Sequence, residues 1–206
     1  MGEKILFCNV AMGREPDPCI YESGDRSVPA ARTPVRYPVS AYLEAALTPG
    51  EQVRAVLLAK EGRSGRPAEQ IALCAEELEQ AAQRAGARLT HKVIRSFFTQ
   101  TQETHDGLLL ALTDEMTEGA HLLADMTYGP KDLPIVLFTA LNFAERFLHC
   151  EIGHILYGQA EFRDGRVVGT QLCDMGALYC LNSVVSTVQC ASPAQARQLL
   201  RSLLAL

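Results

Sequence analysis

The chain has 206 residues, of which 48% are apolar and 21% charged, and its formal net charge is −5. This length and balance are typical of one globular α/β domain with a short tail. Long nucleic acid is not an expected partner, because the sequence has no block of Lys and Arg to neutralise a phosphate backbone. A small anion held by a few local groups remains compatible with this composition.

The seven cysteines are odd in number, form no C-x-x-C pair and mostly lie in apolar runs. They indicate buried, reduced thiols in a cytoplasmic protein and give no spacing suited to zinc. The N-terminus has no signal-peptide pattern, and no apolar run is long enough to span a membrane. We therefore expect a cytoplasmic protein with no membrane partner, no metal and no cofactor.

The first half of the chain alternates strand and helix patterns. A buried strand is expected at residues 4–10, and residues 15–36, with four prolines, are an irregular segment or a hairpin. The next expected elements are a helix at 39–47, a strand at 53–59, a polar loop at 60–66, a helix at 67–85, a strand at 89–98, a polar loop at 99–104 and a helix at 108–116 capped by Thr104 or Asp106.

The second half continues this alternation and closes with a hairpin. The expected elements are a strand at 121–126, a helix at 135–148, strands at 151–162 and 166–173 joined by an Asp-Gly turn, a helix at 177–188 and a last helix from 193. This order predicts a Rossmann-like, mostly parallel α/β sheet flanked by helices, with a C-terminal β-hairpin. We expect one domain over residues 1–190 and a helical tail over 191–206.

Familiar nucleotide-binding and hydrolase motifs are absent from the sequence. No G-x-G-x-x-G follows the first strand, and neither a Walker A motif nor a G-x-S-x-G elbow occurs. The loop after the first strand runs from Asn9 to Arg14. Gly13 permits a tight turn or a close backbone approach to a ligand, and Arg14 is suited to an anion. A plain turn with one solvated arginine explains these two residues equally well.

A second loop, at residues 125–134, lies between the fourth expected strand and a helix. In an α/β sheet such a loop lies at the carboxyl end of its strand, where ligands bind, and faces the positive end of the helix dipole. Thr127, Tyr128 and Lys131 add two hydroxyls and a cation, which makes the loop a candidate phosphate site. The alternative is that Gly129 and Pro130 form only a turn and that Asp132 is only a helix cap.

Residues 125–134 read Asp-Met-Thr-Tyr-Gly-Pro-Lys-Asp-Leu-Pro. This loop resembles the Asp-x-Thr-x-Gly-x-Arg/Lys-x-x-Pro loop found after the fourth strand in one branch of CARF domains, the CRISPR-associated Rossmann fold. The likeness extends to the loop at 9–14, to the strand at 155–158 and to the hairpin return at Asp174. Together these features span roughly residues 3–190, and their order is more informative than any single motif.

The resemblance implies that the chain binds a cyclic oligoadenylate, a second messenger of type III CRISPR antiviral defence, as a two-fold homodimer. Cyclic tetra-adenylate is the favoured ring, although the residues do not fix ring size. The leucine-rich segment 199–206 also favours a dimer. The implied ligand-binding residues are Asn9, Met12, Gly13, Arg14, Thr99, Gln100, Thr127, Tyr128, Gly129, Pro130 and Lys131.

Three functions remain open at this point. The first is a metal-independent ring nuclease in which Lys131 and Thr127 are catalytic and act on an in-line attack by a ribose 2′-hydroxyl. The second is a pure sensor, and the third is an unrelated α/β nucleotide hydrolase. The last helix has no Arg-x-x-x-x-His motif of HEPN ribonucleases, so the chain is either free-standing or the sensor part of a longer protein. His105 either approaches the site or is only a neighbour of a helix cap.

Overall fold

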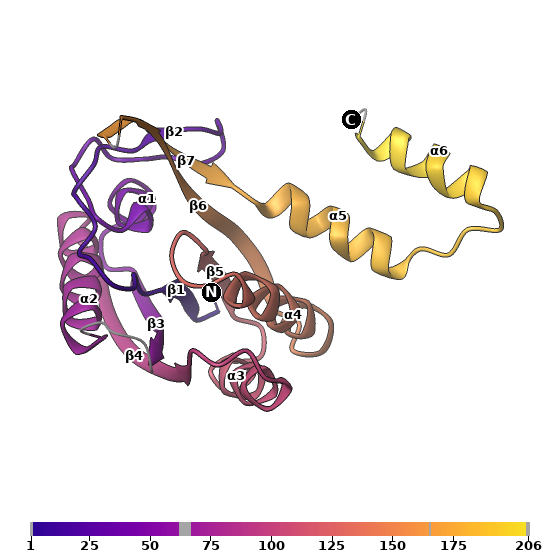
Figure 1. The fold of residues 1–206 in the computed structure, drawn as a ribbon, viewed down its shortest axis with the longest axis horizontal. Coiled ribbons are helices and arrows are strands. Elements are labelled where there is room, and N and C mark those ends of the chain that lie inside the picture. Colours follow the sequence, from indigo (N-terminus) through magenta and orange to yellow (C-terminus); the bar gives the residue numbers. More distant parts are fainter. Residues whose placement is uncertain (1, 62–66, 165, 205–206) are drawn as a thin grey trace. The chain divides into compact units, whose positions relative to one another are not determined.

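The computed structural model describes residues 2–61, 67–164 and 166–204, with Arg166 described by its backbone alone. It confirms the predicted α/β fold class: a mostly parallel sheet with strand order β2-β7-β6-β5-β1-β3-β4, flanked by helices (Figure 1). The strands are β1 (Lys4–Asn9), β2 (Glu22–Ser23), β3 (Gln52–Glu61), β4 (Arg88–Phe97), β5 (His121–Asp125), β6 (Glu151–Arg163) and β7 (Arg166–Asp174).

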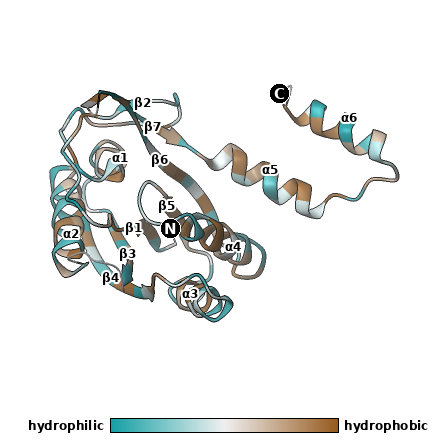
Figure 2. Ribbon diagram, viewed as in Figure 1, coloured by the Kyte–Doolittle hydropathy of each residue, from teal (hydrophilic) through white to brown (hydrophobic). Residues whose placement is uncertain are grey.

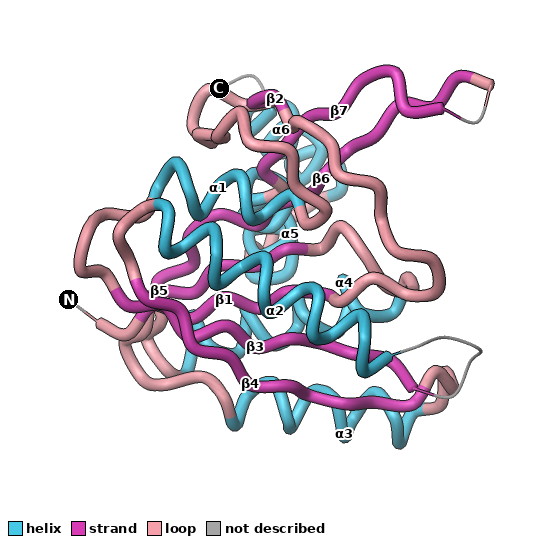
Figure 3. Tube along the Cα trace, turned by 90° about the vertical axis from the view of Figure 1, so that its left-hand side faces the viewer, coloured by secondary structure: helices cyan, strands magenta, loops and turns pink. Residues whose placement is uncertain are grey.

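The described residues form the helices α1 (Pro38–Ala46), α2 (Pro67–Arg84), α3 (Gln102–Asp114), α4 (Asp132–Phe147), α5 (Gly176–Thr187) and α6 (Pro193–Leu204). The first four of these helices pack on the two faces of the sheet. Figure 3 shows α1 and α2 on one face and α3 on the opposite face, where α3 packs against α4. The middle of the central strand β1 is apolar because side chains on both of its faces are covered: Ile5, Leu6 and Phe7 are fully buried.

The strand order reverses at β1. From β1 the chain builds outward through β3 and β4 on one side, and through β5, β6 and the antiparallel β7 on the other. The loops that follow β1 and β5 therefore leave neighbouring strands toward opposite faces of the sheet, and a crevice lies between them at its carboxyl edge. Such a switch point is where open α/β sheets bind their ligands.

The irregular segment at 15–36 contains one internal bridge and one short strand that pairs with the sheet edge. Its residues Cys19 and Val35 form an antiparallel bridge, and the short strand β2 pairs in parallel with β7. The segment therefore contributes an edge strand to the sheet and also a local hairpin-like bridge. The polar loop expected at 60–66 lies, from residue 62 on, outside the described residues, and its first residue, Lys60, belongs to β3.

Two helices begin earlier than the sequence pattern predicts. Helix α3 begins at Gln102 because the side chain of Thr101 caps it by accepting the Thr104 N–H at 3.3 Å. Helix α4 begins at Asp132, although Pro134 lies in its first turn. A proline is tolerated there because the first N–H groups of a helix have no intrahelical acceptor. The expected start at 135 was therefore wrong by almost one turn.

The chain divides into two compact units, residues 1–176 and 177–206. The second unit contains most of α5 and all of α6. No helix in the described part of the chain is long and apolar enough to cross a membrane. All seven cysteines are free; Cys8, Cys74 and Cys150 are buried, whereas Cys180 is exposed.

Candidate functional site

The loops that follow β1 and β5 form an open depression of about 470 Å³ at the switch point. It is lined by Met12, Gly13, Phe98, Thr127, Tyr128, Gly129 and Pro130. Every lining residue except Phe98 is one for which the sequence predicted ligand contact. Folding therefore brings the two predicted loops together, although more than a hundred residues separate them along the chain. The lining carries no charged side chain.

Two glycines give this depression its backbone shape. Gly13 has φ +82° and Gly129 has φ +92°, a left-handed conformation that other residues adopt only with strain. A Cβ at Gly129 would also lie 2.6 Å from Cδ1 of Leu133. The backbone N–H groups of Tyr128 and Gly129 have no hydrogen-bond partner among the described residues. They are free to donate to a phosphate just before the N-terminus of α4.

Thr127 anchors the loop internally. Its hydroxyl donates to Oδ1 of Asp125 at 2.5 Å and accepts the N–H of Gly158 at 2.8 Å, while its own N–H donates to the same Asp125 oxygen at 2.8 Å. The hydroxyl proton is thus committed to Asp125. In this conformation Thr127 positions the loop against β6 and offers a ligand its remaining lone pair.

Asp125 is fully buried at the end of β5. Besides both groups of Thr127, it accepts the N–H of Val39 in the first turn of α1. Burial raises the pKa of this carboxyl to about 6, and these hydrogen bonds oppose the rise. The Asp125 side chain therefore links the switch-point loop to the start of α1. The free energy of burying this side chain is less favourable when the carboxyl is ionised.

This raised pKa predicts a pH-dependent stability. Below pH ~4 the carboxyl is protonated in both the folded and unfolded states; between pH ~4 and about 6 only the unfolded state releases the proton, so stability falls as the pH rises. The loss should level off above pH 6 at about 2–3 kcal/mol. Urea unfolding of the wild type and Asp125→Asn from pH 4 to 7.5 measures it: the variant should gain on the wild type across this window, and a constant difference would contradict the assignment.

Tyr128 joins the two loops through its ring. The hydroxyl donates to the carbonyl of Arg36 at 2.7 Å, and the ring meets that of Tyr37 edge to face, with centroids 5.4 Å apart. Tyr37 in turn accepts the N–H of Ala11 at 3.4 Å, which fixes the loop after β1. Burial raises the pKa of both phenols, so both stay neutral. Tyr128 thus offers the depression part of its ring, while its hydroxyl is already bonded.

Asn9 is the most informative polar residue near the depression. It ends β1, its side chain is fully buried, and neither Nδ2 nor Oδ1 has a hydrogen-bond partner in the described part of the chain. Its Cβ lies 3.8 Å from the position that a Cβ would take at Gly129. A buried amide without a partner is costly, and native proteins satisfy such groups with water or a ligand. Asn9 therefore places a hydrogen-bond donor and an acceptor without partners beneath the loop that follows β5.

Five predicted contacts lie outside the lining: the buried Asn9 and four exposed residues, Arg14, Thr99, Gln100 and Lys131. The Arg14 side chain is 82% exposed and pairs with Asp17 at 2.9 Å. Thr99 and Gln100 are exposed, and Gln100 donates to the carbonyl of Phe98 at 3.2 Å. Lys131 is exposed and follows the lining residue Pro130 directly. The structure therefore brings the backbone and apolar contacts together and leaves the cations at or beyond the rim.

Phe98 and Lys60 are the residues near the site that sequence reasoning missed. Phe98 follows β4 at the same carboxyl edge, but an aromatic at the end of an apolar run is usually a core residue. Lys60, near the end of β3, forms an ion pair with Asp132 at 2.8 Å, and their side chains are 0% and 6% exposed. A buried lysine cannot be distinguished from a solvated one by its neighbours in sequence.

The Lys60–Asp132 pair holds the first turn of α4 against β3. Burial acts to raise the pKa of Asp132, but hydrogen bonds and charge from Lys60, with help from Gln100, outweigh it and keep the pKa below its usual value. Nε2 of His105 lies 3.6 Å from the same carboxylate and lines a separate groove between α3 and α4. His105 is thus a neighbour of the ion pair and not part of the depression lining. Through its ion pair with Lys60, Asp132 fixes the end of the loop at 126–131 against β3.

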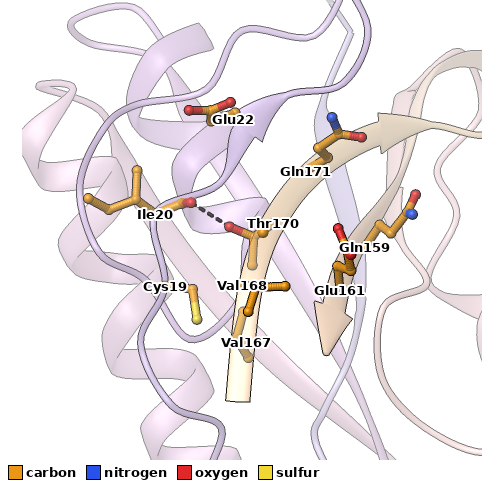
Figure 4. A pocket seen from close by; sticks show the side chains of 10 residues that line it. Cys19, Ile20, Glu22, Gln159, Glu161, Val167, Val168, Thr170 and Gln171 are labelled. Atoms are coloured by element: carbon orange, nitrogen blue, oxygen red, sulfur yellow. Dashed lines mark hydrogen bonds between the residues drawn. The ribbon is translucent and has the colours of Figure 1, made fainter. Parts of the chain in front are cut away.

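A larger cavity of about 580 Å³ lies elsewhere, along the edge of the β6–β7 hairpin (Figure 4). The segment around Cys19 and Ile20 forms its other wall, and Thr170 donates to the carbonyl of Ile20 at 2.5 Å. Its charged lining groups are the carboxylates of Glu22 and Glu161. These repel an anion, so the smaller depression at the switch point is the better candidate for a phosphate-containing ligand.

Comparisons with known proteins identify no relative of this chain. The sequence matches no protein-family model and no curated protein. Among the described residues, no group of three His, Cys, Asp or Glu side chains is placed to hold a metal ion.

Proposed function

We propose that this chain binds a cyclic oligoadenylate at the switch-point depression and acts as a CARF-type sensor. The observation that carries the proposal is the convergence of the two predicted loops on one depression, with the buried, unpartnered Asn9 directly beneath the loop that contains Gly129. The loop at residues 125–134 supports it through its resemblance to the CARF motif. The strand reversal at β1 supports the location, because a ligand crevice forms between two such neighbouring loops at the carboxyl edge.

The groups around the depression match the parts of such a ligand. The free N–H groups of Tyr128 and Gly129 are suited to phosphate oxygens, and Lys131 at the rim adds a cation. Asn9 supplies one donor and one acceptor for a ribose hydroxyl or an adenine edge. Phe98 and Met12 give the bases an apolar surface. The lining carries no carboxylate that would repel the phosphates of the ring.

The depression is open, and one protomer offers it a single pair of loops. A ring of repeated adenosines has two-fold symmetry, which suits a site assembled from two copies related by a two-fold axis. The proposal therefore includes a homodimer with the ligand across its axis. Cleavage of the bound ring is a second candidate activity, favoured by the exposure of Lys131 next to the lining.

Ligand-induced stabilisation tests the binding proposal. A ligand that binds only the native state at 100 times its Kd stabilises it by about 2.7 kcal/mol, which raises Tm by roughly 5–10 °C for a chain of this size. Cyclic tetra-adenylate should produce this shift, and linear tetra-adenylate a smaller one. A flat response to rings of four and six adenosines would remove the proposal.

Asn9→Leu is the matched variant for this experiment. Leucine has a similar volume and removes the unpartnered amide, so the free protein should be at least as stable as the wild type. The ligand-induced rise in Tm should nevertheless fall to less than half, because the buried donor and acceptor are lost. A variant that is destabilised yet keeps the full ligand response would show that Asn9 has a purely structural role.

A further inference from the structure

The cavity along the β6–β7 hairpin lies where β7 is close to the open edge of the sheet (Figure 4). On its outer side β7 pairs with the short strand β2, and only over Gln171 and Leu172. Next to this pairing, Thr170 bonds to the carbonyl of Ile20 through its hydroxyl. In the described part of the chain, residues 167–169 of β7 therefore have a partner strand, β6, on one side alone. We call the cavity at this edge the edge groove.

Backbone groups of β7 face outward along this edge. On the outer side of the strand, the carbonyl of Leu172 accepts the N–H of Gly24 at 2.8 Å. Because successive residues of a strand direct their N–H and C=O groups to alternate sides, those of Thr170 face the same side as those of Leu172. Val168 has no residue opposite it on β6, since the register shifts at this point. An edge of this kind is a template on which an extended segment can add as a further strand.

The hairpin mixes hydrophilic and hydrophobic residues (Figure 2), and their alternation makes one face of the edge acidic. Glu22, Gln171 and Gln159 lie opposite one another on β2, β7 and β6, so their side chains share a face of the sheet. Two residues further along the hairpin, Glu161 lies opposite Gly169 on that same face. The two carboxylates are the charged groups of the described lining, and they favour basic side chains on an added strand.

Gly169 leaves a path from the edge to Glu161. A Cβ at Gly169 would lie 3.8 Å from Oε2 of Glu161, so this carboxylate leans over β7 at a position that has no side chain. The other oxygen, Oε1, lies 3.9 Å from Arg163, and the two side chains are 67% and 73% exposed. Such an exposed pair is weak and leaves Oε2 available. Because neighbouring strands are about 4.8 Å apart, a lysine or arginine on a strand added to β7 can cross Gly169 and reach this oxygen.

We propose that the edge groove binds an extended segment of another protein, which adds to β7 as a strand and places a lysine or arginine over Gly169 against Glu161. Hydrogen bonds to the β7 backbone hold the added strand, and the acidic face selects its basic side chains. A second copy of this chain fits poorly, because edge-to-edge pairing about a two-fold axis brings the carboxylates of both copies together. Phosphate backbones of nucleic acids are repelled by the same groups.

The proposal is independent of the proposed function. The edge groove lies wholly within residues 1–176 and shares no lining residue with the switch-point depression. Loss of peptide binding therefore leaves the response to cyclic oligoadenylate unchanged, and the reverse also holds.

An NMR titration with a capped hexapeptide of alternating lysine and valine tests the groove. The peptide should bind saturably, shift the amide signals of Ile20 and residues 167–171, and slow hydrogen exchange at the N–H of Thr170. The same peptide with glutamate in place of lysine should bind at least about tenfold more weakly. A lysine–valine peptide with N-methylated backbone amides keeps its charge but cannot form the ladder, and it should lose a similar factor.

Gly169→Val separates the path across β7 from the edge itself. Gly169 has no positive φ, and its Cβ position is in ordinary contact distance of Glu161, so valine should leave Tm within a few degrees of the wild type. It should weaken binding of the lysine–valine peptide about tenfold, because it blocks the path to Glu161. Glu161→Gln removes the charge alone and should weaken binding about fivefold.

Glu118→Gln is the matched control, since it removes an exposed carboxylate from a loop outside the groove. It should change peptide affinity less than about twofold. Failure of the lysine–valine peptide to saturate, equal binding of the acidic or N-methylated peptide, or amide shifts centred elsewhere would each overturn the proposal. Unchanged affinity in both Gly169→Val and Glu161→Gln would do the same.

Discussion

Lys60→Met is expected to destabilise the protein by about 3–5 kcal/mol, because it leaves the buried Asp132 carboxylate without its cation. Methionine fills the space of the lysine stem, so the loss arises mainly from the unpaired charge. Urea unfolding at pH 7 measures it. The carboxylate also lies at the first position of α4, so the loop over the depression should loosen with it. We therefore expect weaker ligand-induced stabilisation in the same variant.

Two further variants give this measurement its controls. Lys92→Met changes an exposed lysine on β4 that pairs with Glu115, and it should change stability by less than about 1 kcal/mol. The double variant Lys60→Met with Asp132→Leu replaces the buried pair by apolar side chains and should recover most of the lost stability. If Lys60→Met unfolds at the same urea concentration as the wild type, the ion pair does not hold α4 to β3.

The parts of the site that the sequence predicted depend on rules of backbone geometry. Gly13 was expected to permit a tight turn and Gly129 to lie in a turn, and both adopt positive φ. The loops that contain them meet because parallel strands place their carboxyl ends at one edge of the sheet. The strand and helix order is equally local in origin: apolar periodicity located β1, β3 and β5 to within a few residues.

The parts that the sequence did not predict depend on burial and on partners far along the chain. Thr127 and Tyr128 appeared free to bind a ligand, but Asp125, Gly158 and Arg36 already bond their hydroxyls. Lys60 was placed in a solvated loop, yet it is buried because Asp132 lies opposite it. Local sequence shows which donors exist, whereas only the fold shows which of them are already used. Asn9 is the reverse case, since its lack of partners is visible only in the structure.

If the chain cleaves its ligand, Lys131→Ala should slow single-turnover cleavage of labelled cyclic tetra-adenylate on the order of 10²-fold, and weaken binding much less. In this reaction a ribose 2′-oxygen attacks the adjacent phosphorus, and the bond from phosphorus to the 5′-oxygen breaks. The attacking 2′-hydroxyl loses its proton and the leaving 5′-oxygen takes one up, so the products are a 2′,3′-cyclic phosphate and a 5′-hydroxyl. Negative charge builds on the phosphate oxygens mainly in the transition state, so a cation that reaches them affects rate more than affinity.

Arg14→Ala is the matched control, because it removes another exposed cation that lies outside the lining and is paired with Asp17. It should change the cleavage rate by no more than a few-fold. The assay runs with excess chelator and separates intact ring from linear product. An intact ring after long incubation with saturating wild-type protein would leave the sensor alone, and Lys131→Ala would then affect only binding. Cleavage that requires a metal ion would contradict both CARF-type activities and favour an unrelated nucleotide hydrolase, since a Lys131-based mechanism stabilises the phosphate without one.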